Sequence, residues 1–599
     1  MASHGNPKKT VVLSALLFAF VAIGLGVVSP AQAASDPMKM VPKDSLFCVR
    51  INSLDNALGQ TDMFLAGVSP IGVSMLAKAQ LGQLLGSANL AGVDTTGGFA
   101  LFSPLPGGDP DPTRIGLLVP VSNYQQFISG NTNVSAANAQ GISQIGPAGS
   151  PMMSVTQVGG FALVSPAGNE EALAQAKTAL TSSTSGLAGT LDPAELKQSS
   201  AAPVWAYANI KLVSQMFGPM IQGQLQELKE GMGAMSAQGQ GQAGTAQVAA
   251  AMDMYASILD TVLKETDFVS LSLLPSAASM RLGLTVASTP GTEMAGMLKA
   301  SATKQSNKLM GYLQDGAAMN FAGTMDGPFW EKFNQVYIDM LPKFLGQDAS
   351  GEAMDQLKKM ATDAMGAFAG PIAGSMSAKQ GSTPPFEVKY VAVLKDAQKF
   401  YQILEQAPKM MNEGPVGDFY EKMGMKVSFD LKRKAQTYKG VAIDTVAFNM
   451  EATEAGSPEA EMLKTMYGDG FNVNMAVVDN LLVYALAKDE GVAVREMIDK
   501  VKAGGATQAP AEVESAMGLI PGADKADFLV TINALRMMGM AAAIAPIPLP
   551  QSQVPSRSNM ALAGTVGDGK LKIELALPKQ HVQEIMGLVM QMQMQGAQP

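Results

Sequence analysis

The chain has 599 residues, of which 47% are hydrophobic and 16% are charged, and its formal net charge is −9. This composition is too apolar for intrinsic disorder, and at this length we expect two or more domains, each with its own core. An acidic chain without a concentrated Lys/Arg patch is a poor candidate for binding nucleic acid or anionic membrane surfaces.

Residues 1–33 have the layout of a secretory signal peptide. Two lysines precede an apolar span at 11–28, and Ala31-Gln32-Ala33 supplies the small residues of a cleavage site. We expect cleavage after Ala33, which leaves 40 basic against 51 acidic residues. An uncleaved N-terminal membrane anchor is the alternative, because the apolar span is long. No later stretch reaches the roughly 18 apolar residues of a transmembrane helix, so we expect a soluble protein of the periplasm or the extracellular space.

Cysteine and histidine are nearly absent from the mature chain. Cys48 is the only cysteine, so no intramolecular disulfide can form, and its place in an apolar run predicts a small buried side chain. His581 is the only histidine after the signal peptide, and we interpret it as solvated or as a helix cap. Zinc sites and Ser-His-Asp or Cys-His catalysis need residues that the chain barely has. We therefore expect no catalytic residue, metal ligand or cofactor.

A strand that leads directly into a helix recurs along the chain. In Asp44–Gln60, DSLFCVRINSLDNALGQ, an apolar run ends at Asn52-Ser53, where a polar side chain can cap the next helix. The pattern returns at 203–212 and 527–535, each time with an asparagine before the helical run, and more loosely at 317–326.

Each copy leads through a helical interval to a pair of strands and a further helix, a series that we call unit A. Asp568-Gly569 predicts a tight hairpin turn in the last copy, because glycine permits a positive φ. In the third copy only the second strand, at 386–394, is recognisable. A second series, unit B, runs from strand through an acidic turn to an amphipathic helix at 158–180 and 478–501. The order A, B, A, A, B, A indicates a duplicated domain.

We therefore predict an α+β fold of two similar tandem domains, each an antiparallel sheet covered by amphipathic helices. After the signal peptide at 1–33, the first domain spans 34–305 and contains a long helical-hairpin insertion at 211–265. The second domain spans 306–599 and contains a helical insertion at 327–378.

The two insertions carry long apolar stripes at helical spacing. Methionine is abundant, at 42 of 599 residues, and its flexible side chain lets an apolar face adapt to varied partners or lipid-like ligands. The alternative is that methionine simply replaces leucine in cores. The residues of the candidate apolar contact surface are Met216, Met220, Leu225, Leu228, Met232, Met252, Tyr255 and Trp330.

The segment at 41–60, VPKDSLFCVRINSLDNALGQ, followed by cycles of strand, helices, hairpin and helix, resembles the large uncharacterised secreted bacterial proteins of domain-of-unknown-function families. The resemblance implies an α+β repeat protein and carries over no functional residues.

These observations favour a non-enzymatic exported protein that binds an unknown protein or lipid-like ligand, or that associates with the cell envelope. Two alternatives stay open. One is a metal-dependent hydrolase that uses carboxylates, because the sequence does not give the separation of carboxylates in space. The other is a purely structural or inhibitory module that a single partner recognises.

Overall fold

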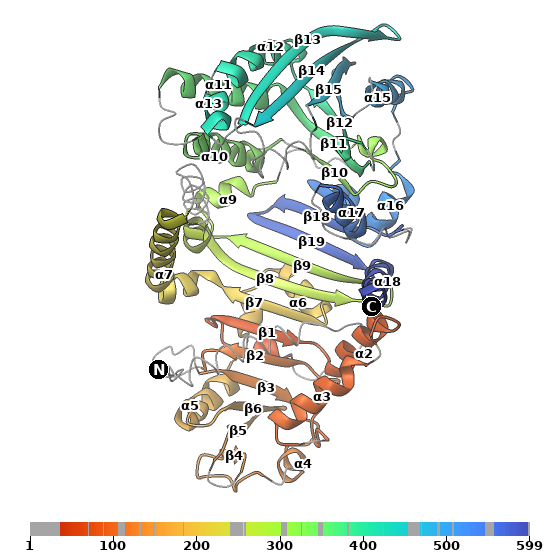
Figure 1. The fold of residues 1–599 in the computed structure, drawn as a ribbon. Helices are drawn as coiled ribbons and strands as arrows, with labels where there is room; N and C mark the ends of the chain where they lie inside the picture. The colour runs from red at the N-terminus through yellow and green to blue at the C-terminus, as the bar shows by residue number, and fades with distance from the viewer. Residues whose placement is uncertain are drawn as a thin grey trace. The chain divides into compact units, whose positions relative to one another are not determined.

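The structure is a computed structural model, and it forms two compact units. Unit 1 takes its residues from the chain up to 217 and from 266–287, and unit 2 takes them from 218–265 and 288–599. Figure 1 draws the elements of both units, which we describe separately. The residues that the structure describes are 36–69, 71–87, 89–105, 114–130, 133–147, 150–183, 185–239, 256, 259–300, 308–324, 326–345, 351–379, 382–413, 415–422, 425–452, 468, 470–487, 491–505, 508–544 and 556–596.

Unit 1 is built on an antiparallel sheet with β1 in its middle. In the register, Cys48 of β1 lies opposite Phe102 of β2 and Tyr207 of β7. The remaining pairings give the order β4-β5-β6-β3-β2-β1-β7-β8. The strands are β1 (Phe47–Ile51), β2 (Phe99–Ser103), β3 (Gly116–Pro120), β4 (Ser143–Ile145), β5 (Met153–Val158), β6 (Phe161–Pro166), β7 (Val204–Asn209) and β8 (Thr266–Pro275), and β9 (Ser279–Ser288) follows them in the chain.

Helical elements cover both faces of this sheet, because its strands are apolar on both sides. One core gathers Cys48, Phe102 and Trp205, and the other gathers Phe99 and Phe127. Cys48 is 0% exposed, which confirms the prediction of a buried side chain. The helical elements of unit 1 are η1 (Pro37–Lys39), α2 (Leu54–Leu65), α3 (Val73–Leu84), α4 (Tyr124–Ser129), α5 (Glu170–Thr181), η2 (Leu187–Gly189) and α6 (Pro193–Ala201).

Polar side chains begin the helices after β1 and β7, as predicted. The Ser53 hydroxyl accepts the backbone N–H of Asn56 at 3.3 Å. At the end of β7, Oδ1 of Asn209 accepts the N–H of Leu212 at 3.0 Å and so begins α7 (Ile210–Gly239). Each contact satisfies one of the N–H groups that a helix start leaves without a partner.

Unit 2 is also built on an antiparallel sheet. Its pairings give the order β13-β14-β15-β16-β12-β11-β10-β17-β18-β19. The predicted turn at Asp568-Gly569 is confirmed, with φ angles of 54° and 71° between β18 and β19. The strands are β10 (Met319–Thr324), β11 (Phe368–Ala378), β12 (Phe386–Leu394), β13 (Met425–Tyr438), β14 (Val441–Ala452), β15 (Phe471–Val478), β16 (Leu481–Leu486), β17 (Phe528–Ile532), β18 (Met560–Gly567) and β19 (Lys570–Pro578).

Two cores hold the helices of unit 2 against its strands. One contains Val483 and Ile498, and the other contains Leu404 and Phe429. The helical elements are α9 (Glu293–Met297), η3 (Met310–Tyr312), α10 (Pro328–Leu345), α11 (Glu352–Gly366), α12 (Ala397–Glu413), α13 (Pro415–Lys422), α15 (Val492–Lys502), α16 (Ala511–Met517), η4 (Ala523–Lys525), α17 (Ala534–Ile544) and α18 (Lys579–Gly596).

The α+β class predicted from the sequence is confirmed at the level of a large antiparallel sheet combined with many helices. In the insertion predicted at 211–265, α7 covers 210–239 and residues 259–265 are helical. Gln222 Nε2 donates to Asp260 Oδ1 at 3.2 Å across this insertion. Within the described residues, no helix combines the length and the apolar character needed to cross a bilayer.

The helical insertion predicted at 327–378 is wrong over its last 11 residues, which form strand β11. This strand pairs with β10 on one side and β12 on the other. The strand is hard to recognise in the sequence because it contains small residues such as Gly374. A Cβ on Gly374 would lie 2.5 Å from the Phe321 ring. Glycine is required there because the large side chain of the neighbouring strand lies over it.

Candidate functional site

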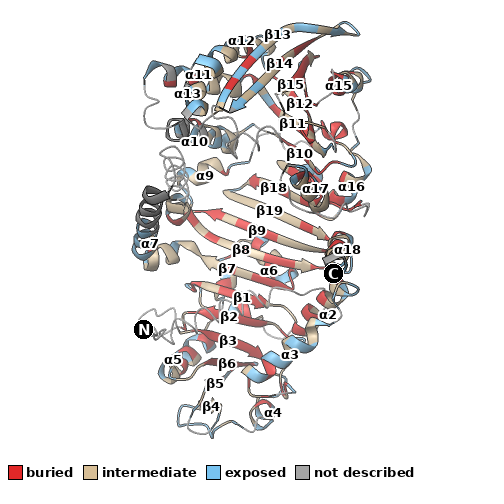
Figure 2. Cartoon of the chain, in the orientation of Figure 1, coloured by how far each residue is buried: buried red, intermediate tan, exposed pale blue. Residues whose placement is uncertain are grey.

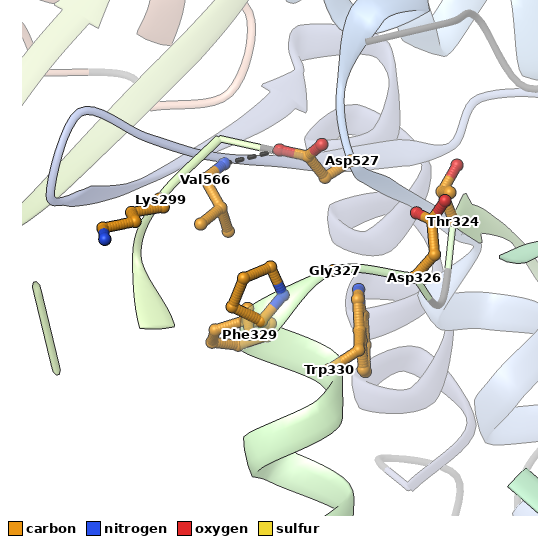
Figure 3. A pocket seen from close by; sticks show the side chains of 9 residues that line it. Lys299, Thr324, Asp326, Gly327, Phe329, Trp330, Asp527 and Val566 are labelled. Atoms are coloured by element: carbon orange, nitrogen blue, oxygen red, sulfur yellow. Dashed lines mark hydrogen bonds between the residues drawn. The ribbon is translucent and has the colours of Figure 1, made fainter. Parts of the chain in front are cut away.

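A small pocket lies at the N-terminal end of α10 in unit 2, where β10, β18 and the residue before β17 contribute to its wall (Figure 3). Its volume of about 10 Å³ is room for about one water molecule. A pocket of this size accepts a water molecule or the end of one side chain rather than a metabolite. It is lined by Lys299, Thr324, Asp326, Gly327, Pro328, Phe329, Trp330, Asp527 and Val566.

Backbone groups fix the polar wall of this pocket. Oδ2 of Asp527 accepts the N–H of Val566 at 2.5 Å, drawn as a dashed line in Figure 3, and the carbonyl oxygen of Asp527 accepts the N–H of Thr324 at 2.9 Å. Figure 3 shows the ammonium group of Lys299 pointing away from the carboxylates of Asp527 and Asp326. The Asp527 carboxylate thus ties the start of β17 to β18.

Three aromatic rings cluster on the first turns of α10. The rings of Trp330 and Phe333 lie 5.8 Å apart at 80°, and those of Phe329 and Trp330 lie 5.4 Å apart at 82°. Phe333 is 53% exposed, and Val336 on the next turn is 40% exposed. We call Phe329, Trp330, Phe333 and Val336 the α10 apolar face.

The other side of α10 is anchored to its neighbours. Ile338 is only 4% exposed, and α10 packs against α11, in which Met354 and Leu357 are also buried. Beside the apolar face, one turn before Val336, Lys332 of α10 forms an ion pair with Glu293 of α9, and this hydrogen-bonded partner raises the pKa of Lys332. These contacts fix the rotation of the helix, so Phe333 and Val336 of the α10 apolar face stay exposed while Phe329 and Trp330 are half-buried.

The structure describes only part of the contact surface that the sequence predicts. Trp330 is half-buried within the α10 apolar face, Met216 is half-buried, and Met220 is 54% exposed. The ring neighbours of Trp330 come from its own helix rather than from methionines. Leu225, Leu228 and Met232 belong to α7, but the structure does not describe their side chains. Met252 and Tyr255 lie outside the described residues.

A second exposed apolar cluster lies in unit 1, where α2 ends and α3 begins, and Figure 2 colours part of α3 as exposed. The exposed fractions are 45% for Met63, 70% for Ile71, 81% for Met75 and 58% for Leu76. We call these four residues the α2–α3 tip. Because exposed large apolar groups rarely gather on a monomeric protein without a role, the tip is a second candidate contact surface.

Asp62 holds the α2–α3 tip in shape. Its Oδ1 accepts the N–H groups of Val73 at 2.6 Å and Ser74 at 3.3 Å, and its Oδ2 accepts the Ser74 hydroxyl. This cluster was not predicted from the sequence. The signal was the absence of any charged residue between Asp62 and Lys78.

His581 is 0% exposed, so the prediction of a solvated histidine is wrong. The alternative prediction, a capping role, is confirmed, although the capped helix is α17 rather than the helix that carries the histidine. Nε2 of His581 accepts the backbone N–H of Ala534, the first residue of α17, at 3.2 Å.

Ser558, His581 and Glu584 lie together but do not form a catalytic triad. The Ser558 hydroxyl lies 3.3 Å from Nδ1 of His581 and donates to Oε2 of Glu584 at 2.7 Å. A triad would need Nε2 free to take the proton of a serine, while the carboxylate orients Nδ1. Here the N–H of Ala534 occupies Nε2, so the arrangement is a structural network.

Within the part of the chain that the structure describes, no group of three or more His, Cys, Asp or Glu side chains is placed to hold a metal ion. Burial raises the pKa of the Cys48 thiol to about 12. The thiol is therefore protonated at neutral pH and is a poor nucleophile.

No family model and no curated protein matches this chain. Among solved structures, crystal forms III and I of TP0453 are similar to it, with TM-scores of 0.22 and 0.20 and 10% sequence identity in both cases. The match to form III covers 46% of this chain and 97% of the other, and the match to form I covers 48% and 99%.

Proposed function

We propose that this chain is an exported, non-enzymatic binding protein that holds an apolar ligand surface, of lipid or protein, against the α10 apolar face. The observation that carries the proposal is Phe333, an aromatic ring more than half exposed on a helix whose opposite side is anchored. Aromatic side chains are enriched at binding surfaces, because they bury a large area at a small cost in conformational entropy. Burying the part of Phe333 and Val336 that is now exposed would contribute about 1 kcal/mol each.

We further infer that the chain arose by duplication of one domain, with the two copies near 34–305 and 306–599. The strand order β5-β6-β3-β2-β1-β7-β8 in unit 1 has the counterpart β15-β16-β12-β11-β10-β17-β18 in unit 2. Backbone contacts outside the ladders also correspond. Asn209 N–H donates to the Leu46 oxygen and Asn533 N–H to the Ala318 oxygen, both at 2.8 Å.

The matching strand orders give the α2–α3 tip and the α10 apolar face equivalent positions in the two units. The pair α2 and α3 follows the central strand β1, and the pair α10 and α11 follows its counterpart β10. Met220 lies in the interval after β7. Of the eleven exposed large hydrophobic residues in the described part of the chain, seven lie in these three intervals. We therefore propose that the helical interval of unit A is the element that carries contact surfaces.

Export is part of the same proposal. Residues 1–33 would direct the chain across a membrane and be removed after Ala33, leaving the mature protein in the periplasm or outside the cell, where it associates with the envelope. These residues lie outside the described structure, so the layout of the sequence alone supports this step.

The test is a double variant, Phe333→Asp with Val336→Asp, compared with Val492→Asp. Val492 is a matched control, because it is an exposed valine (49%) on another helix of the same unit. Binding is measured by co-sedimentation with phosphatidylcholine vesicles and by capture of exported proteins on the immobilised chain. We expect the double variant to lose at least about tenfold in affinity with an unchanged circular dichroism spectrum, and the control to bind as the wild type does.

Three outcomes would contradict the proposal. The wild type could bind neither probe, or the double variant could bind as well as the control. Unfolding of the double variant with a stable control would show that the α10 apolar face is core rather than surface.

A further inference from the structure

His581 lies where three segments of unit 2 meet, namely the start of α17, the residues before β18, and α18. Besides capping α17, it contacts Ser558, which precedes β18, and Glu584 on its own helix. Asn533 donates through Nδ2 to Ser556 Oγ, Ser558 O and Asn559 Oδ1, at 2.7 to 3.1 Å. The start of α17 is therefore tied to the start of β18 and to α18 by one buried network.

The network fixes the tautomer of His581. Because Nε2 accepts the N–H of Ala534, the proton of the neutral ring must sit on Nδ1. There it faces the Ser558 hydroxyl, whose own proton goes to Glu584. Ser556 donates to the same carboxylate oxygen at 2.6 Å. In this series of hydrogen bonds, from Ala534 through His581 and Ser558 to Glu584, each donor has an acceptor. The series requires a neutral imidazole ring.

Charged groups surround the ring unequally. On α18, Glu584 lies 3.6 Å from Nδ1, and on α17 the Arg536 guanidinium repels a second proton. Arg536 is itself paired with Glu512 of α16 at 2.7 Å. Before β18, Arg557 presents its backbone N–H to Glu584 at 3.4 Å. Burial lowers the pKa of His581 below 6.5, and Glu584 offsets only part of this effect.

We propose that His581 is an acid-sensitive latch for α17: when the ring takes a second proton at Nε2, it can no longer accept the Ala534 N–H, and the N-terminal turn of α17 loosens. The protonated ring would turn its charge toward Glu584, because burial without a partner is costly for an imidazolium. The backbone N–H of Ala534, which is partly buried, would then lose this side-chain acceptor. The latch acts within unit 2 and does not depend on the ligand.

The sign of the pH dependence follows from linkage. A histidine with a lowered pKa in the folded state contributes its stability above the unfolded value of 6.5. That contribution is lost as the pH falls from 6.5 to the lower folded-state pKa. In that window, opening of the α17 start should become about tenfold easier for each pH unit.

The test is hydrogen exchange of the full chain, followed by mass spectrometry, between pH 7.5 and 5.0 with exchange times scaled for the intrinsic rate. We expect peptides that contain Ala534 to lose about tenfold in protection per pH unit below 6.5, while peptides of α15 do not. In His581→Gln, a side-chain oxygen replaces Nε2 as an acceptor that does not titrate, so protection should be independent of pH. In His581→Asn the shorter amide keeps the contact with Ser558 but does not reach the Ala534 N–H. The protection of Ala534 should therefore be low at every pH.

The proposal is overturned if the Ala534 peptides of the wild type and of His581→Gln respond to pH alike, or if α15 responds as strongly as α17. A second measurement uses only the wild type and therefore tests the proposal even if the variants fold poorly. The chain has two histidines, and the imidazole Hε1 resonance of His581 in the wild type should titrate with a midpoint below 6.5. A midpoint at or above 6.5 would also overturn it.

Discussion

Asn209 and Asn533 make the same contact where β7 and β17 each lead into a helix. Oδ1 of each asparagine accepts the backbone N–H three residues ahead, at 3.0 Å in both cases, from Leu212 and Arg536 respectively. The surroundings differ. Asn533 is 0% exposed and donates to three acceptors, whereas Asn209 is half-buried.

This difference predicts unequal costs for the two alanine substitutions. Asn209→Ala removes a helix cap and should destabilise its unit by about 1 kcal/mol. Asn533→Ala also leaves buried acceptors without a donor, and should cost about 3 kcal/mol. Urea denaturation followed by circular dichroism measures both. Equal losses would show that the buried amide of Asn533 contributes no more than a cap.

Cys48 should be inert in the folded protein. The thiol is fully buried beside Met38, and its pKa is about 12. We expect no reaction with a thiol reagent at pH 8 under native conditions, and one equivalent of reaction in denaturant. Rapid labelling of the folded chain would contradict the burial of β1.

Gly374 should tolerate no side chain, since β11 lies under the Phe321 ring. Gly374→Ala places a Cβ 2.5 Å from that ring and should destabilise unit 2 by about 1–3 kcal/mol. Gly587→Ala is the control, because Gly587 lies within α18 with no atom near a new Cβ. That change should be neutral or stabilising by up to about 1 kcal/mol. Thermal unfolding of the two variants compares them, and a neutral Gly374→Ala would put the β11 register in question.

The mature protein should begin at Ala34. Small residues at Ala31 and Ala33 match the requirement of the signal-peptide cleavage site. Intact-mass measurement of the protein recovered from the exported fraction tests this directly. An intact N-terminus on a membrane-bound product would support the anchor alternative instead.

Local patterns predicted much of the fold. The cap at Ser53, the hairpin turn at Asp568-Gly569 and the buried Cys48 each follow from a preference that acts within a few residues. The strand β11 and the hairpin of β13 and β14 were missed. In β11, small residues at Gly370 and Gly374 weaken the alternation that marks a strand, because its packing is set by Phe321 of a distant segment.

The candidate site depended more on tertiary structure than on pattern. Trp330 was identified from its helix, but the exposed state of Phe333 follows from the burial of Ile338 and the packing of α10 on its neighbours, which no local pattern specifies. The role of His581 was missed for the same reason. Its partner Ala534 is 47 residues away, and only the fold brings the two together.

The most direct test of the proposed function uses Trp330 as a reporter. The chain has two tryptophans, and the other, Trp205, is 0% exposed with its indole N–H donated to Glu195 at 3.0 Å. Acrylamide quenching of the emission therefore reports mainly on Trp330, with Trp330→Phe as the control. We expect phosphatidylcholine vesicles or a captured partner to shift the emission to shorter wavelength and to protect Trp330 from the quencher. Binding of a ligand with no change in the emission or the quenching of Trp330 would contradict a contact surface on α10.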